Sequence, residues 1–191
     1  MDEDKIRNAI SMILSAIGED PEREGLKKTP ERVAKMYCEI CSGYEKNEDD
    51  LVNEAIFCEK NDEMIILRNI SFYSLCEHHM LPFFGKVSVA YIPNGKIIGL
   101  SKIPRIIDMY SQRLQIQERM TMQIANSLEK IINPRGVAVL VEGHHLCSMM
   151  RGVKKEDLSL ITQSFCGQFH DNLELQKAFL SRISVSEEEN K

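Results

Sequence analysis

The sequence predicts an α+β fold, with a helical N-terminal segment followed by an antiparallel sheet and packed helices. Two observations lead to this prediction. Apolar residues recur every three to four positions near the N-terminus and in one long central segment, which is helical spacing. Other segments alternate or form short β-branched runs, which are typical of strands. The order of these elements, two helices, two strands, one or two helices, then two strands and a last helix, favours an antiparallel sheet.

Two helices are predicted to begin the chain. Residues 5–17 carry apolar side chains with helical spacing. A second helix begins at Thr29, which is a good N-cap, with Pro30 in the first helical position, and it ends before Gly43. Residues 45–54 are polar and acidic, so a loop is expected there.

The middle of the chain carries the first strands. One is predicted over residues 64–72. Apolar and smaller or polar residues alternate over 86–91, which is strand periodicity, and a turn at 93–95 closes that strand. A return strand is expected to begin at Ile97.

The second half begins with the longest predicted helix, Gln112 to Ile132, which has an apolar residue at every third or fourth position. The β-branched run 137–141 predicts a buried strand, and residues 158–169 predict another. Residues 171–183 are expected to form a closing helix, and the Glu-rich tail after Ser186 is expected to be frayed.

Composition limits the class of protein. The 191 residues fit one main domain, placed at 51–191, behind an N-terminal helical segment at 1–50. The formal net charge of −5 argues against non-specific nucleic-acid binding. An acidic N-terminus and the lack of an 18-residue apolar run predict a cytoplasmic protein outside the membrane.

Histidine and cysteine cluster at two places. Four of the five histidines stand beside a cysteine, in the runs CEHH (76–79) and HHLC (144–147). Both runs are expected at the ends of strands, where they can share one site. Cys76 and His79 would place a thiolate and an imidazole on the same metal ion, and Cys147 would supply a third ligand. Three protein ligands leave a fourth tetrahedral position for water, which indicates a catalytic zinc ion.

The zinc prediction has chemical consequences for the two remaining histidines beside the ligands. Zinc lowers the pKa of a bound water from about 15.7 to about 7. His78 and His145 each adjoin a ligand, and an imidazole can donate or accept protons near neutral pH. Cys38-x-x-Cys41 lies within a helical pattern and has no second pair, so we assign it no metal.

A group of cations favours an anionic ligand. The run SKIPR (101–105) is expected to follow a strand and open a helix, where backbone N–H groups with Lys102 and Arg105 suit a phosphate. Arg151 adds a charge four residues after Cys147. Any one of these cations alone would be typical of a solvated surface. Glu118 lies off the apolar stripe of the long helix, so the helical spacing by itself predicts a surface glutamate.

Four motifs resemble those of the GTP cyclohydrolase I family. They are SLCEHHMLPF (74–83), IGLSKIPR (98–105), QRLQIQER (112–119) and EGHHLCSMMRGV (142–153). The helical segment TPERV (29–33) is similar as well. The resemblance implies conversion of GTP and water to 7,8-dihydroneopterin triphosphate and formate, the first step toward folate and other pterins. It also implies the tunnelling fold, assembled into a homodecamer with sites between subunits.

The resemblance assigns roles near the reacting ring. Cys76, His79 and Cys147 would bind one Zn²⁺ per subunit. His145 would donate a proton to the imidazole ring of guanine, and His78 would assist ring opening and later steps near the ribose.

The resemblance also assigns the residues that bind the rest of the nucleotide. Glu118 would hold the guanine edge, with Gln117 beside it, because a carboxylate accepts two parallel hydrogen bonds. The triphosphate would be held by three cations, Lys102, Arg105 and Arg151. Ser101 would lie near the ribose and phosphates. Arg32 would reach the triphosphate of a neighbouring subunit.

Three alternative functions fit the sequence less well. A nitrile reductase of queuosine synthesis shares the implied fold, but its cysteine nucleophile does not require two His-rich clusters. A zinc deaminase would need His-x-Glu and Pro-Cys-x-x-Cys patterns that the sequence lacks. A zinc-stapled assembly module would need a fourth protein ligand, and would have no use for Glu118 or the cations.

Overall fold

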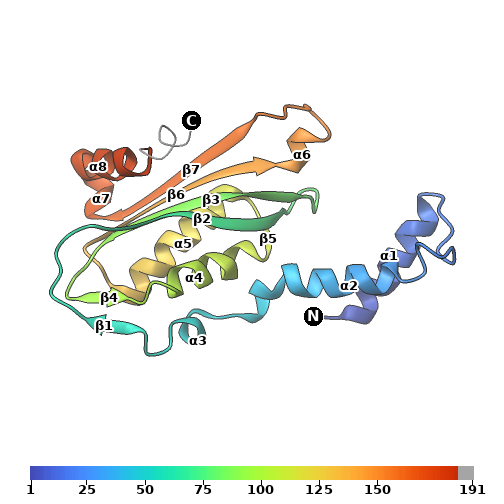
Figure 1. Ribbon diagram of the computed structural model, residues 1–191, viewed down its shortest axis with the longest axis horizontal. Helices are drawn as coiled ribbons and strands as arrows, with labels where there is room; N and C mark the ends of the chain where they lie inside the picture. The colour runs from blue at the N-terminus through green and yellow to red at the C-terminus, as the bar shows by residue number, and fades with distance from the viewer. Residues whose placement is uncertain (185–191) are drawn as a thin grey trace.

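A computed structural model describes residues 1–184 of the chain (Figure 1). Its centre is a five-stranded sheet in the order β5-β2-β3-β6-β7. The strands are β2 (Ile65–Cys76), β3 (Pro82–Ile92), β5 (Leu114–Gln115), β6 (Gly136–His145) and β7 (Ser159–Gly167). All neighbours are antiparallel except β2 and β5, which run parallel.

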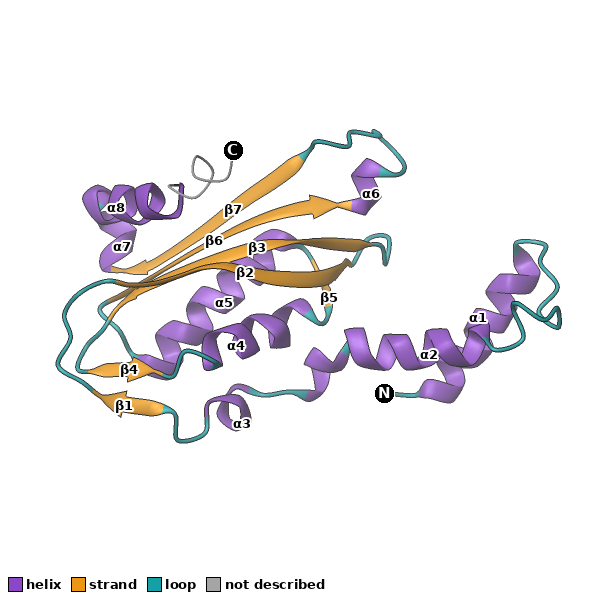
Figure 2. Ribbon diagram, viewed as in Figure 1, coloured by secondary structure: helices purple, strands orange, loops and turns teal. Residues whose placement is uncertain are grey.

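Two helices cover one face of this sheet, as Figure 2 shows. They are α4 (Lys102–Ser111) and α5 (Gln117–Ile132). Their apolar sides pack on alternate residues of the strands, because successive strand side chains point to opposite faces. The fully buried residues at this interface include Val87, Val139, Ile106, Ile124 and Leu128.

The other face of the sheet carries a smaller apolar cluster beneath the C-terminal helices. Helices α7 (Gln168–Asp171) and α8 (Leu173–Ser184) place Phe169 and Phe179 against Ala90 and Ala138. The α+β class and the two helices packed on the sheet are therefore confirmed, and the sheet is antiparallel except for the parallel pair of β2 and β5. The tail predicted to be frayed after Ser186 lies outside the described residues.

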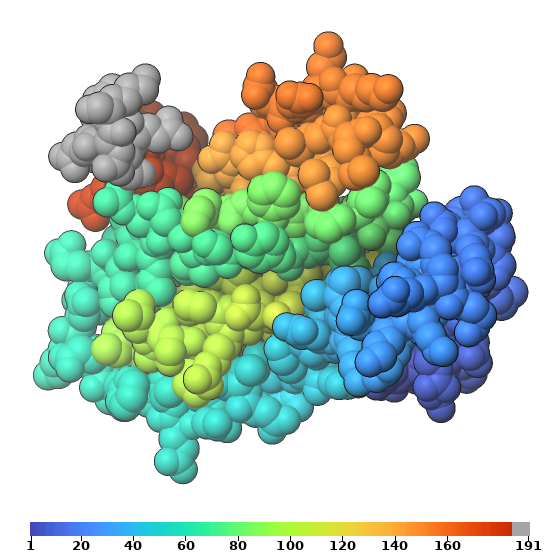
Figure 3. Space-filling view, turned by 45° about the vertical axis from the view of Figure 1, so that its right-hand side comes forward, coloured from blue at the N-terminus to red at the C-terminus, as the bar shows by residue number. Residues whose placement is uncertain are grey.

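The N-terminal segment lies beyond one end of the sheet and forms the blue lobe of Figure 3. Helix α1 (Glu3–Ala16) packs against α2 (Thr29–Ile40), and the 3-10 turn η1 (Ser42–Glu45) follows. Both predicted helices are present. The predicted N-cap is wrong by one residue, because Lys28 occupies the cap position and Thr29 is already helical.

The predicted loop over residues 45–54 contains a short helix, α3 (Glu48–Val52). Tyr110 and Lys130 donate hydrogen bonds of 2.8 Å and 2.7 Å to the Glu48 carboxylate, which attaches α3 to both α4 and α5. Burial by itself raises the pKa of Glu48, but these hydrogen bonds and the charge of Lys130 outweigh it and lower the pKa. The boundary placed at residue 50 falls inside α3, and the division into two domains stays a prediction.

The predicted return strand after the 93–95 turn does not pair with β3, the strand that precedes the turn. Strand β4 (Lys96–Ile98) pairs with β1 (Ile56–Cys58) in a separate two-stranded sheet. It has no place beside β3, because β2 and β6 already occupy both edges of that strand.

The long helix begins later than predicted. Gln112 is the C-cap of α4, and strand β5 intervenes before α5 begins at Gln117. The apolar residue Ile116 fits the helical spacing, although it precedes the first helical residue. Within residues 1–184, no helix is both long and apolar enough to cross a membrane.

Candidate metal centre and active site

The two Cys/His runs meet because the strands that carry them end side by side. Strand β2 ends at Cys76, and a tight turn leads back into β3, with Cys76 accepting a 2.8 Å hydrogen bond from the backbone N–H of Met80. Strand β6 ends at His145, directly opposite Phe83 near the start of β3. The short helix α6 (Leu146–Met149) then carries Cys147 over the same edge.

Three side chains at this edge, those of Cys76, His79 and Cys147, form a candidate metal-binding group. The ligand atoms of Cys76, His79 and Cys147 all lie within 4.8 Å of one another. The Cys76 Sγ is 3.8 Å from the His79 Nδ1. The predicted grouping of these three residues is therefore confirmed, and the donors are two sulfurs and one imidazole nitrogen.

The thiols of this group are held close together in a partly buried place. Burial raises the pKa of Cys147, and the neighbouring Cys76 raises it further. On the solvent side, the Nη1 of Arg151 lies 3.1 Å from the Nε2 of His79. Arg151 thus lies beside the metal-binding group, as its spacing from Cys147 predicted.

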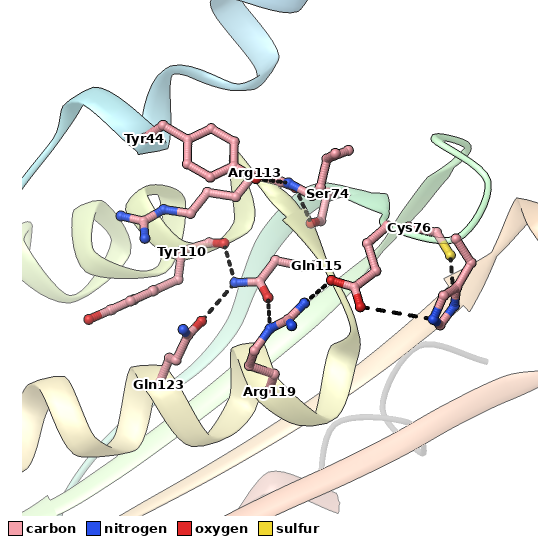
Figure 4. Close-up of polar contacts among 11 residues, drawn as sticks. Tyr44, Ser74, Cys76, Tyr110, Arg113, Gln115, Arg119 and Gln123 are labelled. Atoms are coloured by element: carbon pink, nitrogen blue, oxygen red, sulfur yellow. Dashed lines mark hydrogen bonds and ion pairs between the residues drawn. The ribbon is translucent and has the colours of Figure 1, made fainter.

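A polar network anchors the turn that carries Cys76 and His79 (Figure 4). The backbone N–H of Glu77 donates to the carbonyl of Gln115 on β5, at 3.0 Å. The Arg119 Nε donates to the Gln115 Oε1 at 3.1 Å, and its Nη2 forms an ion pair with Glu77. Strand β5 and the first turn of α5 therefore fix the position of this turn.

Arg113 extends the same network to the N-terminal segment, as Figure 4 also shows. Its Nη2 donates to the Gly43 carbonyl at 2.8 Å, and its guanidinium lies 5.7 Å from the ring centre of Tyr44. The Arg113 carbonyl accepts a 3.4 Å hydrogen bond from Ser74 on β2. The η1 turn is thereby attached to the strand that ends at Cys76.

His145 occupies a half-buried position beside the metal-binding group. Its ring stacks on Phe83, with centroids 4.5 Å apart and planes 4° from parallel. Its Nε2 lies 3.0 Å from the Oε1 of Gln117. Burial lowers the pKa of His145, while the carboxylate of Glu118 opposes that shift.

Gln117 faces the sheet, whereas Glu118 faces the solvent. It was expected beside Glu118 at the guanine edge, but its side chain is completely buried. Gln117 is the first residue of α5 and points at the sheet, whereas the next residue is turned about 100° around the helix and is exposed. Glu118 therefore remains accessible, near enough to His145 to affect its charge.

The structure does not bring Lys102 and Arg105 to the metal-binding group of their own chain. The C-terminal end of α4 leads into β5, which pairs with β2 beside Cys76. At about 1.5 Å per residue along a helix, Lys102 lies about 14 Å and Arg105 about 9 Å from the C-terminal end of α4. The Lys102 Nζ instead donates to the carbonyl of Leu51 at 2.8 Å.

The remaining predicted residues are accessible. Ser101 precedes α4 and is exposed, and Arg32 is exposed on α2. His78 is also exposed, with its Nδ1 3.9 Å from the Cys76 Sγ. His144 points to the opposite face of the sheet from His145 and lies near Phe84, at 6.1 Å between ring centres.

Two residues of the site were not identified from the sequence. Thr162 on β7 accepts a 3.1 Å hydrogen bond from the Gln117 Nε2. Gly143 on β6 leaves room for the same amide, because a Cβ there would lie 2.3 Å from the Gln117 Oε1. Neither role is visible in local sequence, since both depend on how β6, β7 and α5 are placed relative to one another.

Comparisons with known proteins agree with this arrangement. A family model described as GTP cyclohydrolase I matches residues 6–184. GTP cyclohydrolase 1 of Campylobacter curvus (strain 525.92) is 50% identical over 186 residues, which cover 97% of this chain and 98% of that protein. GTP cyclohydrolase 1 of Synechococcus sp. (strain JA-3-3Ab) is 53% identical over 175 residues, covering 92% of this chain and 76% of that protein.

A solved structure is also similar over part of the chain. The archaeosine synthase QueF-Like in its apo form aligns with a TM-score of 0.46 and 20% sequence identity, over 56% of this chain and 97% of that chain. The family match over residues 6–184 and the 50% identity over nearly the whole length show that this chain belongs to the GTP cyclohydrolase I family.

Proposed function

We propose that this protein converts GTP and water to 7,8-dihydroneopterin triphosphate and formate. The observation that carries the proposal is the meeting of Cys76, His79 and Cys147 at one strand edge, with His145 beside them and Glu118 exposed nearby. Membership of the GTP cyclohydrolase I family supports the same reaction.

The donor set fits a zinc ion. Two thiolates and one imidazole suit zinc better than magnesium or calcium, which prefer oxygen ligands. Three protein ligands leave one tetrahedral position open, as in catalytic zinc sites. When bound, zinc would supply Lewis-acid chemistry and lower the pKa of a coordinated water to about 7.

The chain's own residues would orient guanine and move protons. Glu118 would accept hydrogen bonds from the N1–H and 2-amino groups of guanine, because a carboxylate has two acceptor oxygens. His145 would donate a proton to N7 and so prevent charge from accumulating on the five-membered ring while C8 is lost as formate. His78, exposed on the same turn as His79, would assist ring opening and the later steps near the ribose.

The phosphate-binding residues support a site shared between copies of the chain. Arg151 lies at the metal-binding group, whereas Lys102 and Arg105 lie toward the far end of α4. A site that uses all three cations would therefore combine the metal-binding edge of one copy with the α4 of another. We propose a homodecamer, in which Ser101 and Arg32 also lie at the phosphates.

The activity is tested by mixing zinc-loaded protein with GTP and measuring formate and, after oxidation, pterin fluorescence. Both products are expected, and a fully metallated, folded protein that yields neither would refute the proposal. Glu118→Ala should weaken GTP binding without loss of zinc, whereas unchanged binding and turnover would remove Glu118 from the site.

The shared site is tested by complementation between two inactive variants. Arg105→Ala damages the phosphate end of α4, and His145→Asn damages the metal-binding edge. Co-expression of both variants should restore part of the activity, because some sites would combine an intact edge with an intact α4. Separately purified variants, measured at the same total concentration, are the control. No recovery in oligomers shown to contain both variants would indicate that each site lies within one chain.

A further inference from the structure

The half-buried side chain of Lys102 is held by the short helix α3 of the same chain. Its Nζ donates to the carbonyl of Leu51 at 2.8 Å, and among residues 1–184 this ammonium has no other hydrogen-bond or ion-pair partner. Leu51 belongs to the last turn of α3, where the carbonyls cannot all find partners within so short a helix. An ammonium has three N–H donors, so the bond to Leu51 leaves two for a bound anion.

A second hydrogen bond joins the same two segments of the chain. The backbone N–H of Gly99 donates to the carbonyl of Ala55, just after α3, at 2.9 Å. The backbone N–H of Lys102 in turn donates to the Gly99 carbonyl, also at 2.9 Å. The backbone of Lys102 and its ammonium group are therefore both placed by residues 51–55.

The carboxylate of Glu48 fixes the position of α3. Tyr110 on α4 donates to its Oε1 at 2.8 Å, and Lys130 on α5 donates to its Oε2 at 2.7 Å. A helix of five residues is not stable by itself, so its position depends on such contacts. Val52 is buried at the other end of α3, but apolar packing is non-directional. The directional bonds of Glu48 therefore set the angle of the helix and the direction of the Leu51 carbonyl.

We propose that Glu48 is a positioning residue for the triphosphate: through α3 it holds the Leu51 carbonyl, which orients the Lys102 ammonium toward the bound phosphates. The proposal rests on the proposed function, which assigns Lys102 to the phosphates. Glu48 does not contact the phosphates, because both of its oxygens accept from Tyr110 and Lys130. Its effect is to lower the entropic cost of binding, since a lysine that is already ordered loses less rotamer freedom.

Inorganic triphosphate is the probe for this proposal, and calorimetric titration of the zinc-loaded protein measures its affinity. Lys102→Ala should bind about 10- to 100-fold more weakly than the wild type, as expected for lost hydrogen bonds to a charged group. Glu48→Ala should raise the Kd by about 3- to 10-fold, because the rotamer freedom of a whole lysine side chain is worth at most about 30-fold. A wild-type protein that does not bind triphosphate would overturn the proposal.

Asp49→Ala is the matched control for Glu48→Ala. It removes one carboxylate from the exposed side of the same helix, and no side chain of α4 or α5 bonds to that carboxylate within the described part of the chain. Its triphosphate affinity should not fall. A loss as large as that of Glu48→Ala would show that the effect comes from the general disturbance of α3, and would refute the role of the Glu48 hydrogen bonds.

A double-mutant cycle shows whether Glu48 acts through Lys102. In the Lys102→Ala background, Glu48→Ala should change the triphosphate affinity by less than about 2-fold, because the group that it positions is already absent. A merely structural role of Glu48 would weaken binding equally in both backgrounds, and that result would overturn the proposal. So would a Glu48→Ala protein that binds triphosphate as tightly as the wild type.

Tyr110→Phe provides a second cycle should Glu48→Ala fail to fold. It keeps the ring that lies 5.1 Å from the Arg113 guanidinium but removes the hydroxyl that donates to Glu48. Triphosphate binding should weaken by about 2-fold or more, and only where Lys102 is present. Equal losses with and without Lys102, or no loss in either background, would contradict the proposal.

Steady-state kinetics with GTP separates this proposal from the proposed function. Glu48→Ala should raise KM and leave kcat unchanged, because the phosphates do not react and are bound equally in the ground state and the transition state. A fall in kcat with unchanged KM would overturn the positioning role. A protein that shows the expected coupling for triphosphate but does not act on GTP would refute only the proposed function. A protein that acts on GTP without this coupling would refute only the role of Glu48.

Discussion

Replacing Gly143 with alanine tests how closely the sheet and α5 are fitted around His145. The new Cβ would lie 2.3 Å from the Gln117 Oε1 and 3.2 Å from its Cδ. Non-bonded carbon atoms prefer a separation of about 3.5 Å, so the amide would have to retreat by about 1 Å. It cannot do so freely, because its nitrogen is already held by Val141, Leu160 and Thr162.

The expected size of this effect follows from two opposing contributions. Overpacking a buried position typically costs about 1–3 kcal/mol. Replacing glycine restricts the unfolded chain and returns about 0.4–1 kcal/mol. Gly143→Ala should therefore lower the free energy of unfolding by about 1.3 kcal/mol at the middle of these ranges, and by about 2.6 kcal/mol at most. The displaced Gln117 would also release His145, and a misplacement of about 1 Å can reduce turnover by about 100-fold.

Urea denaturation at a fixed protein concentration measures the first effect, and initial rates with GTP measure the second. Gly25→Ala is the control, because its Cβ would meet only the end of the flexible Arg23 side chain, at 3.0 Å. That variant should keep full stability and activity. A Gly143→Ala protein that also matches the wild type in both assays would show that the amide is not confined as described.

Three further changes test other parts of the structure. In Arg119→Lys, the ammonium group cannot donate to Gln115 and Glu77 at once, as the planar guanidinium does. Zinc affinity, measured by competition with a chelator, should therefore fall by about 10- to 100-fold. Unaltered affinity would show that this network does not support the metal site. Cys147→Ser should lose most of its bound zinc in elemental analysis, and wild-type zinc content would exclude Cys147 as a ligand. Burial raises the pKa of Glu48 but its hydrogen bonds lower it by more, so its stabilisation is present at neutral pH and is lost as the pH falls through the folded-state pKa. Glu48→Gln should therefore lower the free energy of unfolding by about 0.2–1 kcal/mol at pH 7, and by less in acid. A difference between the two proteins that stays constant as the pH is lowered would refute the charge-dependent role of Glu48.

The sequence predicted the parts of the site that local chain geometry controls. Cys76 and His79 belong to one turn at the end of a strand, so their spacing was enough to bring them together. Cys147 follows a β-branched run that could only be a buried strand, and its register with β3 then placed it at the same edge. The pattern of apolar residues also predicted a helix that includes all of α5.

Other features depend on contacts between segments that are distant in sequence. The two-residue strand β5 is too short to show any periodicity, so the predicted long helix ran through it to Gln112. Gln117 could be read as a neighbour of Glu118, but its burial depends on the packing of α5 against β6 and β7. Thr162 contacts it only because β7 aligns with β6 in one register.

The central claim is that this chain removes C8 of GTP as formate. The most direct measurement follows GTP labelled with ¹³C at C8 by ¹³C NMR, with zinc-loaded protein and with the His145→Asn variant as the control. The label should appear in formate with the wild type and remain in the nucleotide with the variant. Label that stays in a purine or pterin ring after turnover by the wild type would contradict the proposed reaction.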